Sequence, residues 1–136
     1  MKRISLFAFL CISLSLTTCS KEDNLVNPQV AIFELIGDWE WVSSSGGITG
    51  EELSPDIVDE TRQLYVTATE FIFSRNNLEE SRVMYDIKLD RSIFTTDSVQ
   101  VIQLDGINAF TYELDGDRLI LREEIYDGYN HLYERR

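Results

Sequence analysis

Few residues in this chain have the type and spacing that catalysis requires. His131 is the only histidine in the 136 residues. Zinc sites are usually built from several His or Cys ligands, so a metal here would have to depend on carboxylates. The Ser43–Ser45 run does not have the sequence of a nucleophile elbow, and no second histidine is available to activate it. We therefore expect a protein that is not an enzyme and that holds no metal or other cofactor.

Acidic residues are numerous, but their pattern favours turns and solvated surfaces. A glycosidase needs two carboxylates about 5–10 Å apart across a cleft, whereas neighbours on a strand point to opposite faces. The sequence leaves open a pairing of acids from different strands. Asp115-Gly116-Asp117 resembles part of a calcium loop but lacks the remaining ligands, which favours a hairpin turn. Three acidic doublets are present: Glu51-Glu52, Glu79-Glu80 and Glu123-Glu124.

The thiol of Cys19 is the one group whose context predicts a reaction. Basic residues at positions 2 and 3 precede an apolar run of thirteen residues, 4–16. That run is shorter than the about 20 residues of a membrane-spanning helix and fits the core of a signal peptide. Residues 16–19, Leu-Thr-Thr-Cys, resemble the lipobox of bacterial lipoproteins. The resemblance implies a signal peptide over 1–18 and a lipid on Cys19; the alternative is an ordinary secretory signal with a chance cysteine.

Charge and composition after Cys19 predict how the chain meets the membrane. Without residues 1–18 the chain has 24 acidic and 10 basic side chains, a formal charge of −14. That charge repels nucleic acid and anionic headgroups, so we expect the lipid alone to attach the protein to the membrane. Residues 19–33 are interpreted as the lipidated cysteine and a flexible tether. Residues 20–23, Ser-Lys-Glu-Asp, resemble a surface-export signal of some Gram-negative lineages, in which a Lys is followed by acids. The resemblance implies an outer-membrane lipoprotein on the cell surface. The alternative is a lipoprotein on the periplasmic face of that membrane.

Residues 34–136 have the alternating pattern of β-strands. Asp-Gly pairs, a strong hairpin signal, separate the last strands at 105–106, 115–116 and 127–128. A phase slip within 97–104 predicts a β-bulge. Eight strands joined mostly by short connections predict an all-β fold, an eight-stranded antiparallel up-and-down barrel, with a two-sheet sandwich as the alternative. The expected strands cover about 37–43, 63–67, 70–75, 82–89, 97–104, 109–114, 118–125 and 129–135.

The first and last strands carry a short motif. Gly37-Asp38-Trp39 opens the first strand, a long loop follows over 43–61, and two arginines end the chain. This resembles the lipocalin-like, or calycin, group of eight-stranded barrels. The resemblance implies a structural motif of Gly37, Trp39 and Arg135, in which the arginine covers the indole at the closed end of the barrel; Arg136 is the second choice. It also implies that loop 43–61 lies at the open end.

Two functions from different classes fit this barrel. In the first, the interior binds a small, largely apolar molecule, lined by the inward aromatic residues Trp41, Phe73, Tyr85 and Tyr112. In the second, the barrel is filled by its own side chains, and the outer surface docks a protein or glycan partner at the cell envelope. Eight strands enclose a space just wide enough for either arrangement.

Overall fold

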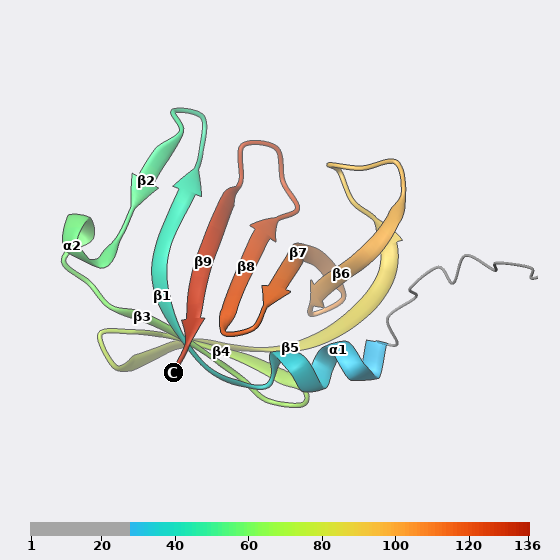
Figure 1. Cartoon of the computed structure of the whole chain (residues 1–136), viewed down its shortest axis with the longest axis horizontal. Coiled ribbons are helices and arrows are strands. Elements are labelled where there is room, and N and C mark those ends of the chain that lie inside the picture. The colour runs from blue at the N-terminus through green and yellow to red at the C-terminus, as the bar shows by residue number, and fades with distance from the viewer. Residues whose placement is uncertain (1–27) are drawn as a thin grey trace, which may run out of the picture.

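The computed structural model describes residues 28–136, which form a closed antiparallel barrel with one helix across its end (Figure 1). The predicted signal peptide, Cys19 and the first part of the predicted tether lie outside the described residues. No helix of the described part is long and apolar enough to cross a membrane. The elements are α1 (Pro28–Leu35), β1 (Gly37–Gly46), β2 (Glu51–Leu53), α2 (Pro55–Val58), β3 (Arg62–Val66), β4 (Glu70–Arg75), β5 (Leu78–Arg91), β6 (Ser98–Leu104), β7 (Ile107–Asp115), β8 (Arg118–Glu123) and β9 (Tyr129–Arg135).

Eight of these strands close the barrel. β3 to β8 each pair with the next strand in sequence, and β9 follows β8 as the last strand. β1 pairs with β3 through its first half and with β9 along most of its length, from Trp39↔Arg135 to Gly46↔Tyr129. The predicted up-and-down barrel is confirmed, because the first and last strands of the meander are hydrogen-bonded to each other. β2 is an additional strand that pairs only with the end of β1.

Two tight turns have the backbone geometry that their residues allow. Asn76 and Asn77 have φ of 50° and 63°, and Asp105 and Gly106 have φ of 49° and 82°. A type I′ turn needs positive φ at both central positions, which Asn, Asp and Gly adopt at the least cost. These turns join β4 to β5 and β6 to β7 and set the register of both hairpins. The predicted bulge in β6 is also present, between Ile102 and Gln103.

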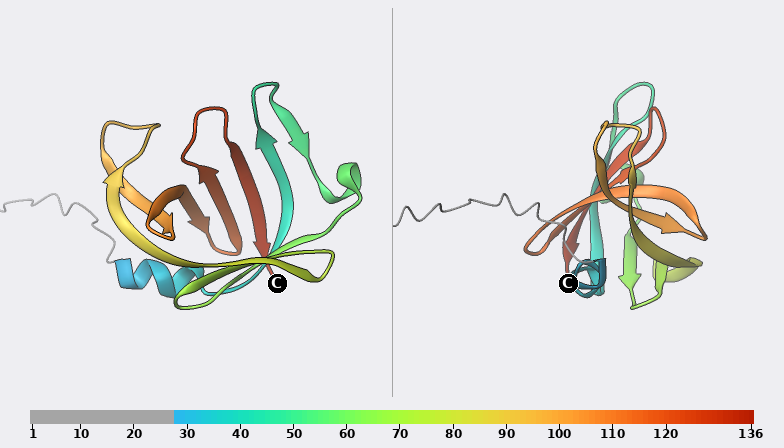
Figure 2. Two further views of the ribbon diagram at one scale, coloured as in Figure 1. Left: turned by 180° about the vertical axis from the view of Figure 1, so that it is seen from behind. Right: turned by 90° about the vertical axis from the view of Figure 1, so that its right-hand side faces the viewer.

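The predicted tether was wrong over its last residues, because helix α1 occupies Pro28–Leu35. Ala31 and Leu35 are 1 % and 0 % exposed and belong to the main core. The physical reason is that one end of the barrel would otherwise leave its apolar interior uncovered. In every view α1 lies across this end, which we call the closed end, and the β1–β2, β5–β6 and β8–β9 loops project from the opposite side (Figures 1 and 2).

The predicted loop 43–61 is also more ordered than expected. β1 continues to Gly46, and β2 pairs with it from Ser44↔Leu53 to Gly46↔Glu51. A bulge lies between Trp41 and Ser43 in the pairing of β1 with β9. It shifts the alternation by one residue, so Ser44 is buried and Ser43 is not.

Among the described residues, one cluster of buried side chains forms the core of the barrel. Its buried members come from α1 and from seven of the eight barrel strands: Ala31, Leu35, Trp39, Trp41, Leu64, Val66, Phe71, Tyr85, Ile87, Ile102, Leu119, Leu121 and Tyr133. Partly buried side chains of β7 pack against this cluster. A chain that begins at Ser20 therefore contains every helix, strand and core residue described here.

Candidate functional site

The closed end is held by Gly37, Trp39 and Arg135, which the structure brings together. The guanidinium carbon of Arg135 lies 4.1 Å from the centroid of the Trp39 ring. The same guanidinium donates hydrogen bonds to the carbonyls of Ile36 (2.9 Å) and Glu34 (2.8 Å). Gly37 has φ of 146°, and a Cβ there would lie 2.7 Å from Arg135 Nη1. Arg135 thus joins the last strand to the residues that link α1 and β1.

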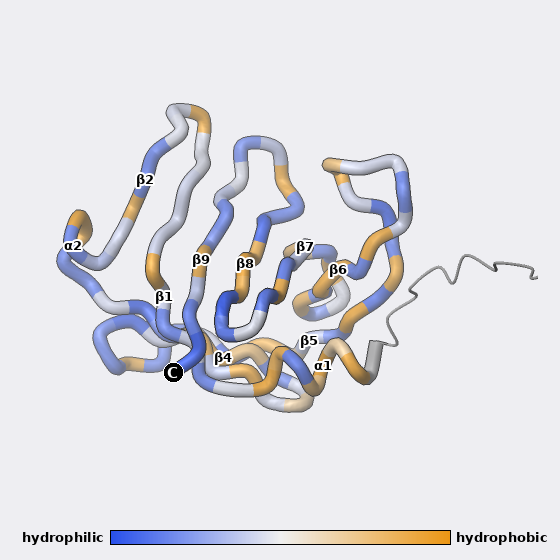
Figure 3. The backbone as a smooth tube through the Cα atoms, in the orientation of Figure 1, coloured by the Kyte–Doolittle hydropathy of each residue, from blue (hydrophilic) through white to orange (hydrophobic). Residues whose placement is uncertain are grey.

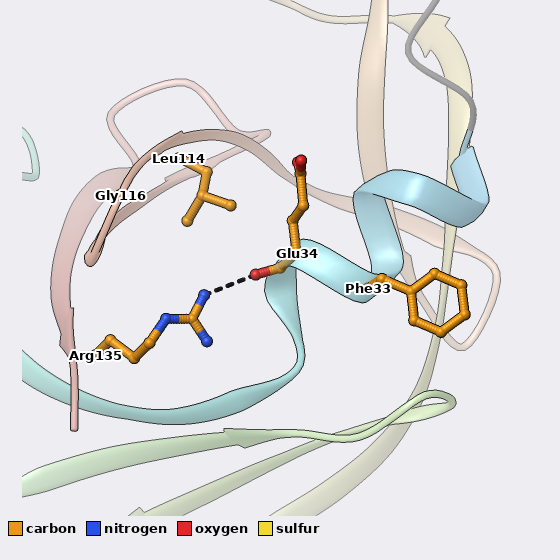
Figure 4. A pocket seen from close by; sticks show the side chains of 5 residues that line it. All are labelled: Phe33, Glu34, Leu114, Gly116 and Arg135. Atoms are coloured by element: carbon orange, nitrogen blue, oxygen red, sulfur yellow. Dashed lines mark hydrogen bonds between the residues drawn. The ribbon is translucent and has the colours of Figure 1, made fainter.

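Beside this contact is an open hollow of about 360 Å³ (Figure 4). Arg135 already donates to two carbonyls, and its Nε is 3.6 Å from Asp117 Oδ1. The guanidinium is therefore engaged in holding α1, and we assign no ligand to the hollow. The lining residues are Phe33, Glu34, Leu114, Gly116 and Arg135.

A series of hydrogen bonds, which we call the Trp41–Glu123 network, lies inside the barrel, farther from α1. Trp41 Nε1 donates to Ser44 Oγ (2.8 Å), and Ser44 Oγ is 2.7 Å from His131 Nδ1. His131 Nε2 lies 3.1 Å from Glu123 Oε1, whose second carboxylate oxygen accepts from the backbone N–H of Tyr129. With a neutral His131 that carries its hydrogen on Nε2, every donor in the Trp41–Glu123 network has an acceptor.

The Trp41–Glu123 network has the residue types of a Ser-His-acid triad, but its geometry indicates that it positions side chains. Ser44 is 1 % exposed, and its Oγ already accepts a hydrogen bond from Trp41. A nucleophile needs a path by which substrate reaches it. The hydrogen bonds instead fix the orientation of the Trp41 indole and the His131 imidazole. Strict alternation would place Ser43 on the inward face with Trp41, and the bulge in β1 places Ser44 there instead.

Tyr133 is the polar side chain of the interior that lacks a partner. It is 6 % exposed, and its hydroxyl forms no hydrogen bond among the described residues. No side-chain N or O atom in residues 30–136 is both sealed from solvent and unpartnered, so solvent must reach this hydroxyl. Burial raises the pKa of Tyr133 to about 12; the charge of Arg62 lowers it and that of Glu123 raises it. The hydroxyl is therefore protonated at neutral pH and able to donate.

The four predicted ligand-lining residues differ in their burial and in whether their polar atoms already have partners within the protein. Trp41 is 2 % exposed and lies directly opposite Tyr133 in the β1–β9 pairing. Phe73 is half-buried, with its ring 6.0 Å from that of Phe71. The hydroxyl of Tyr85 donates to the Thr67 carbonyl at the β3–β4 turn.

The fourth predicted residue, Tyr112, has its hydroxyl hydrogen-bonded to the Gln100 side chain. The hydroxyls of both Tyr85 and Tyr112 are therefore occupied by protein partners. The structure thus brings Trp41 next to Tyr133, an inward aromatic residue of the last strand that was not among the four predicted ligand-lining residues. Its place opposite Trp41 on the last strand was the signal that could have identified it.

The charge above the Trp41 ring is already compensated. The guanidinium carbon of Arg62 lies 4.3 Å from the centroid of that ring. Arg62 is hydrogen-bonded and ion-paired to Glu60, which also pairs with Arg75 at 3.3 Å. A ligand carboxylate would have to compete with Glu60 for this cation. Within residues 28–136, no three His, Cys, Asp or Glu side chains gather to hold a metal ion.

Comparisons of the chain with family models, curated proteins and solved structures gave no match. Its function therefore has to be inferred from the geometry of the barrel itself.

Proposed function

We propose that this chain is a lipid-anchored, lipocalin-like protein that binds a small, uncharged and largely apolar molecule inside its barrel. The observation that carries the proposal is the Tyr133 hydroxyl, which solvent reaches although its side chain is 6 % exposed. Water that reaches this hydroxyl can bond to it, so a ligand oxygen placed there exchanges one hydrogen bond for another, with a net gain of about 0.5–1.5 kcal/mol.

The surroundings of Tyr133 indicate which ligand chemistry fits. Trp41 and Leu119 are its direct cross-strand neighbours and supply apolar walls. The hydroxyl donates at neutral pH, because burial raises its pKa to about 12. Arg62 is paired with Glu60 and does not offer a free positive charge. The best fit is a molecule with an apolar body and a carbonyl, ether or hydroxyl oxygen that accepts from Tyr133.

Two features support the lipocalin-like assignment. The first is the closed eight-stranded meander with a helix across one end. The second is the Gly-x-Trp sequence of the first strand with an arginine of the last strand over its indole. In this assignment the closed end provides stability, and the interior beyond Trp39 holds the ligand.

The anchor and location are part of the proposal and depend on residues before the described part. A lipid on Cys19 would hold the barrel at the outer membrane, and the Lys-Glu-Asp sequence at 21–23 favours the cell surface over the periplasmic face. Alanine at positions 21–23 is expected to reduce the protease accessibility of the protein on intact cells. Unchanged accessibility would argue against surface export.

The binding proposal is tested by thermal unfolding of the chain that begins at Ser20. A panel of neutral apolar compounds, including sterols, fatty alcohols and aromatic ketones, is compared with the matching carboxylic acids. A ligand at 100 times its Kd stabilises a domain by about 2.7 kcal/mol, which shifts Tm measurably. We expect neutral compounds to raise Tm more than their acids do. A panel that leaves Tm unchanged would contradict binding in the barrel.

A further inference from the structure

Three loops opposite the closed end carry exposed apolar side chains. We define the rim as residues 47–53, 92–97 and 124–128, which follow β1, β5 and β8. Figure 3 shows hydrophobic residues at the outer parts of all three loops. Soluble domains rarely expose contiguous apolar patches without a use for them. The exposed apolar residues of the rim are Ile48, Ile93, Phe94, Ile125 and Tyr126, at 39–88 % exposure.

The three loops are hydrogen-bonded to one another and form one surface. The backbone N–H of Gly47 donates to the carbonyl of Gly128, at 3.5 Å. Across the other junction, Ser92 Oγ and the backbone N–H of Ile93 donate to the two carboxylate oxygens of Glu124, at 2.8 and 2.9 Å. The apolar side chains therefore belong to one continuous end of the barrel.

The rim is held in shape by buried polar groups. Glu124 and Ser92 are 9 % and 7 % exposed, and the Ser92 hydroxyl oxygen also accepts from the backbone N–H of Phe94. The Arg122 guanidinium lies 5.7 Å from the centroid of the Phe94 ring. The buried carboxylate of Glu124 thus fixes the loop at Ser92, and the two side chains that follow Ser92, Ile93 and Phe94, face solvent. A preorganised surface loses less conformational entropy when a partner binds.

The charge of the rim limits what can bind there. Every charged residue in the three segments is an acid; Glu124 is buried, and the exposed ones are Glu51, Glu52, Asp97 and Asp127. Arg122 lies beside Phe94 but is paired with Glu113 at 3.7 Å. A symmetric contact between two copies of the chain would place the exposed acids against each other, and such like-charge contacts are unfavourable. Anionic lipid surfaces are repelled for the same reason. A complementary partner combines apolar side chains with positive charge.

We propose that the rim docks a segment of another protein in which aliphatic or aromatic side chains are flanked by Lys or Arg. The apolar side chains of that segment would pack on Phe94, Ile125 and Tyr126, and its basic side chains would face Asp97, Asp127 and Glu51. The rim lies at the end of the barrel opposite α1 (Figure 1). The apolar side chains and the acidic charge of the rim do not depend on the proposed lipid anchor.

The test uses the chain that begins at Ser20 and a short fluorescent peptide with Leu on one helical face and Lys on the other. Two further peptides replace all Leu by Ser or all Lys by Glu. Fluorescence anisotropy should show binding of the Leu-Lys peptide and much weaker binding of both others. Phe94→Ser and Tyr126→Ser should each weaken binding about thirtyfold if these side chains are interface hot spots. Ile107→Ser is the matched control, because Ile107 is 72 % exposed but lies outside the rim.

Several outcomes would overturn the proposal. One is equal binding of the Leu-Lys peptide to the parent chain and both rim variants, with their Tm unchanged. Another is equal binding of the Leu-free peptide, which would indicate charge attraction alone. Rim-dependent binding to phosphatidylcholine vesicles without peptide binding would make the rim a membrane contact. Rim-dependent dimerisation in sedimentation experiments without peptide binding would make it a contact between copies.

Discussion

Replacing Trp39 with alanine tests how the closed end of the barrel is stabilised. The indole is 1 % exposed, donates from Nε1 to the Leu35 carbonyl at 2.8 Å, and lies under the Arg135 guanidinium. Truncating a buried Phe or Trp to Ala usually costs about 3–5 kcal/mol. The substitution also leaves the Leu35 carbonyl without its donor and Arg135 without a ring to cover. We therefore expect a loss near the upper end of that range, about 4–5 kcal/mol.

Urea unfolding followed by circular dichroism measures this loss. With a slope of about 2 kcal/mol per molar urea, the midpoint should fall by about 2 M. Trp39→Phe keeps an aromatic ring but not the Nε1 donor, and should lose only about 1–2 kcal/mol. Glu40→Ala is the control on the exposed face of the same strand and should change stability by less than about 0.5 kcal/mol. Midpoints of Trp39→Ala and Glu40→Ala that agree within error would refute the structural role of Trp39 and Arg135.

Three further predictions concern other parts of the chain. Burial raises the pKa of Tyr85, Tyr112 and Tyr133 to about 12, so the folded chain retains protons that the unfolded chain loses near pH 10. The free energy of unfolding should therefore be at its full value below pH 10 and fall as pH rises toward 12. Urea unfolding, alongside absorbance at 295 nm, measures this dependence. Glu124→Gln should speed hydrogen exchange at the Ile93 amide and cost about 1–3 kcal/mol, because an amide has one acceptor oxygen for two donors; unchanged exchange would argue against this contact. Cys19→Ala should abolish incorporation of radioactive fatty acid, and equal label on both chains would exclude lipidation of Cys19.

The fold was largely predictable from the sequence because the barrel depends on alternation. In β5 the residues Tyr85 and Ile87 are buried while Asp86 and Lys88 are exposed, as the period of two requires. The Asp105-Gly106 pair marked a turn whose backbone geometry few other residues allow. The pairing of Trp39 with Arg135 followed from the family resemblance, not from alternation alone.

The interior site was less predictable because it depends on register and on distant contacts. A single bulge in β1 places Ser44 beside His131, which is 87 positions away in sequence. The contact between the β5–β6 and β8–β9 loops depends on how a long strand curves around the barrel, and local patterns do not encode that curvature. The helix α1 was missed because its two buried residues, Ala31 and Leu35, are stabilised by the barrel end rather than by a clear helical pattern.

The most direct test of the proposed function is the tryptophan emission of the chain during titration with neutral apolar compounds. We expect a saturable change in emission that Trp41→Phe largely removes, because Trp41 lies beside Tyr133 in the interior. Tyr133→Phe should still fold and should weaken binding about fivefold, the equivalent of one hydrogen bond of about 1 kcal/mol. Binding that is unaffected by both substitutions, or no change in emission with any compound, would contradict a ligand site at Trp41 and Tyr133.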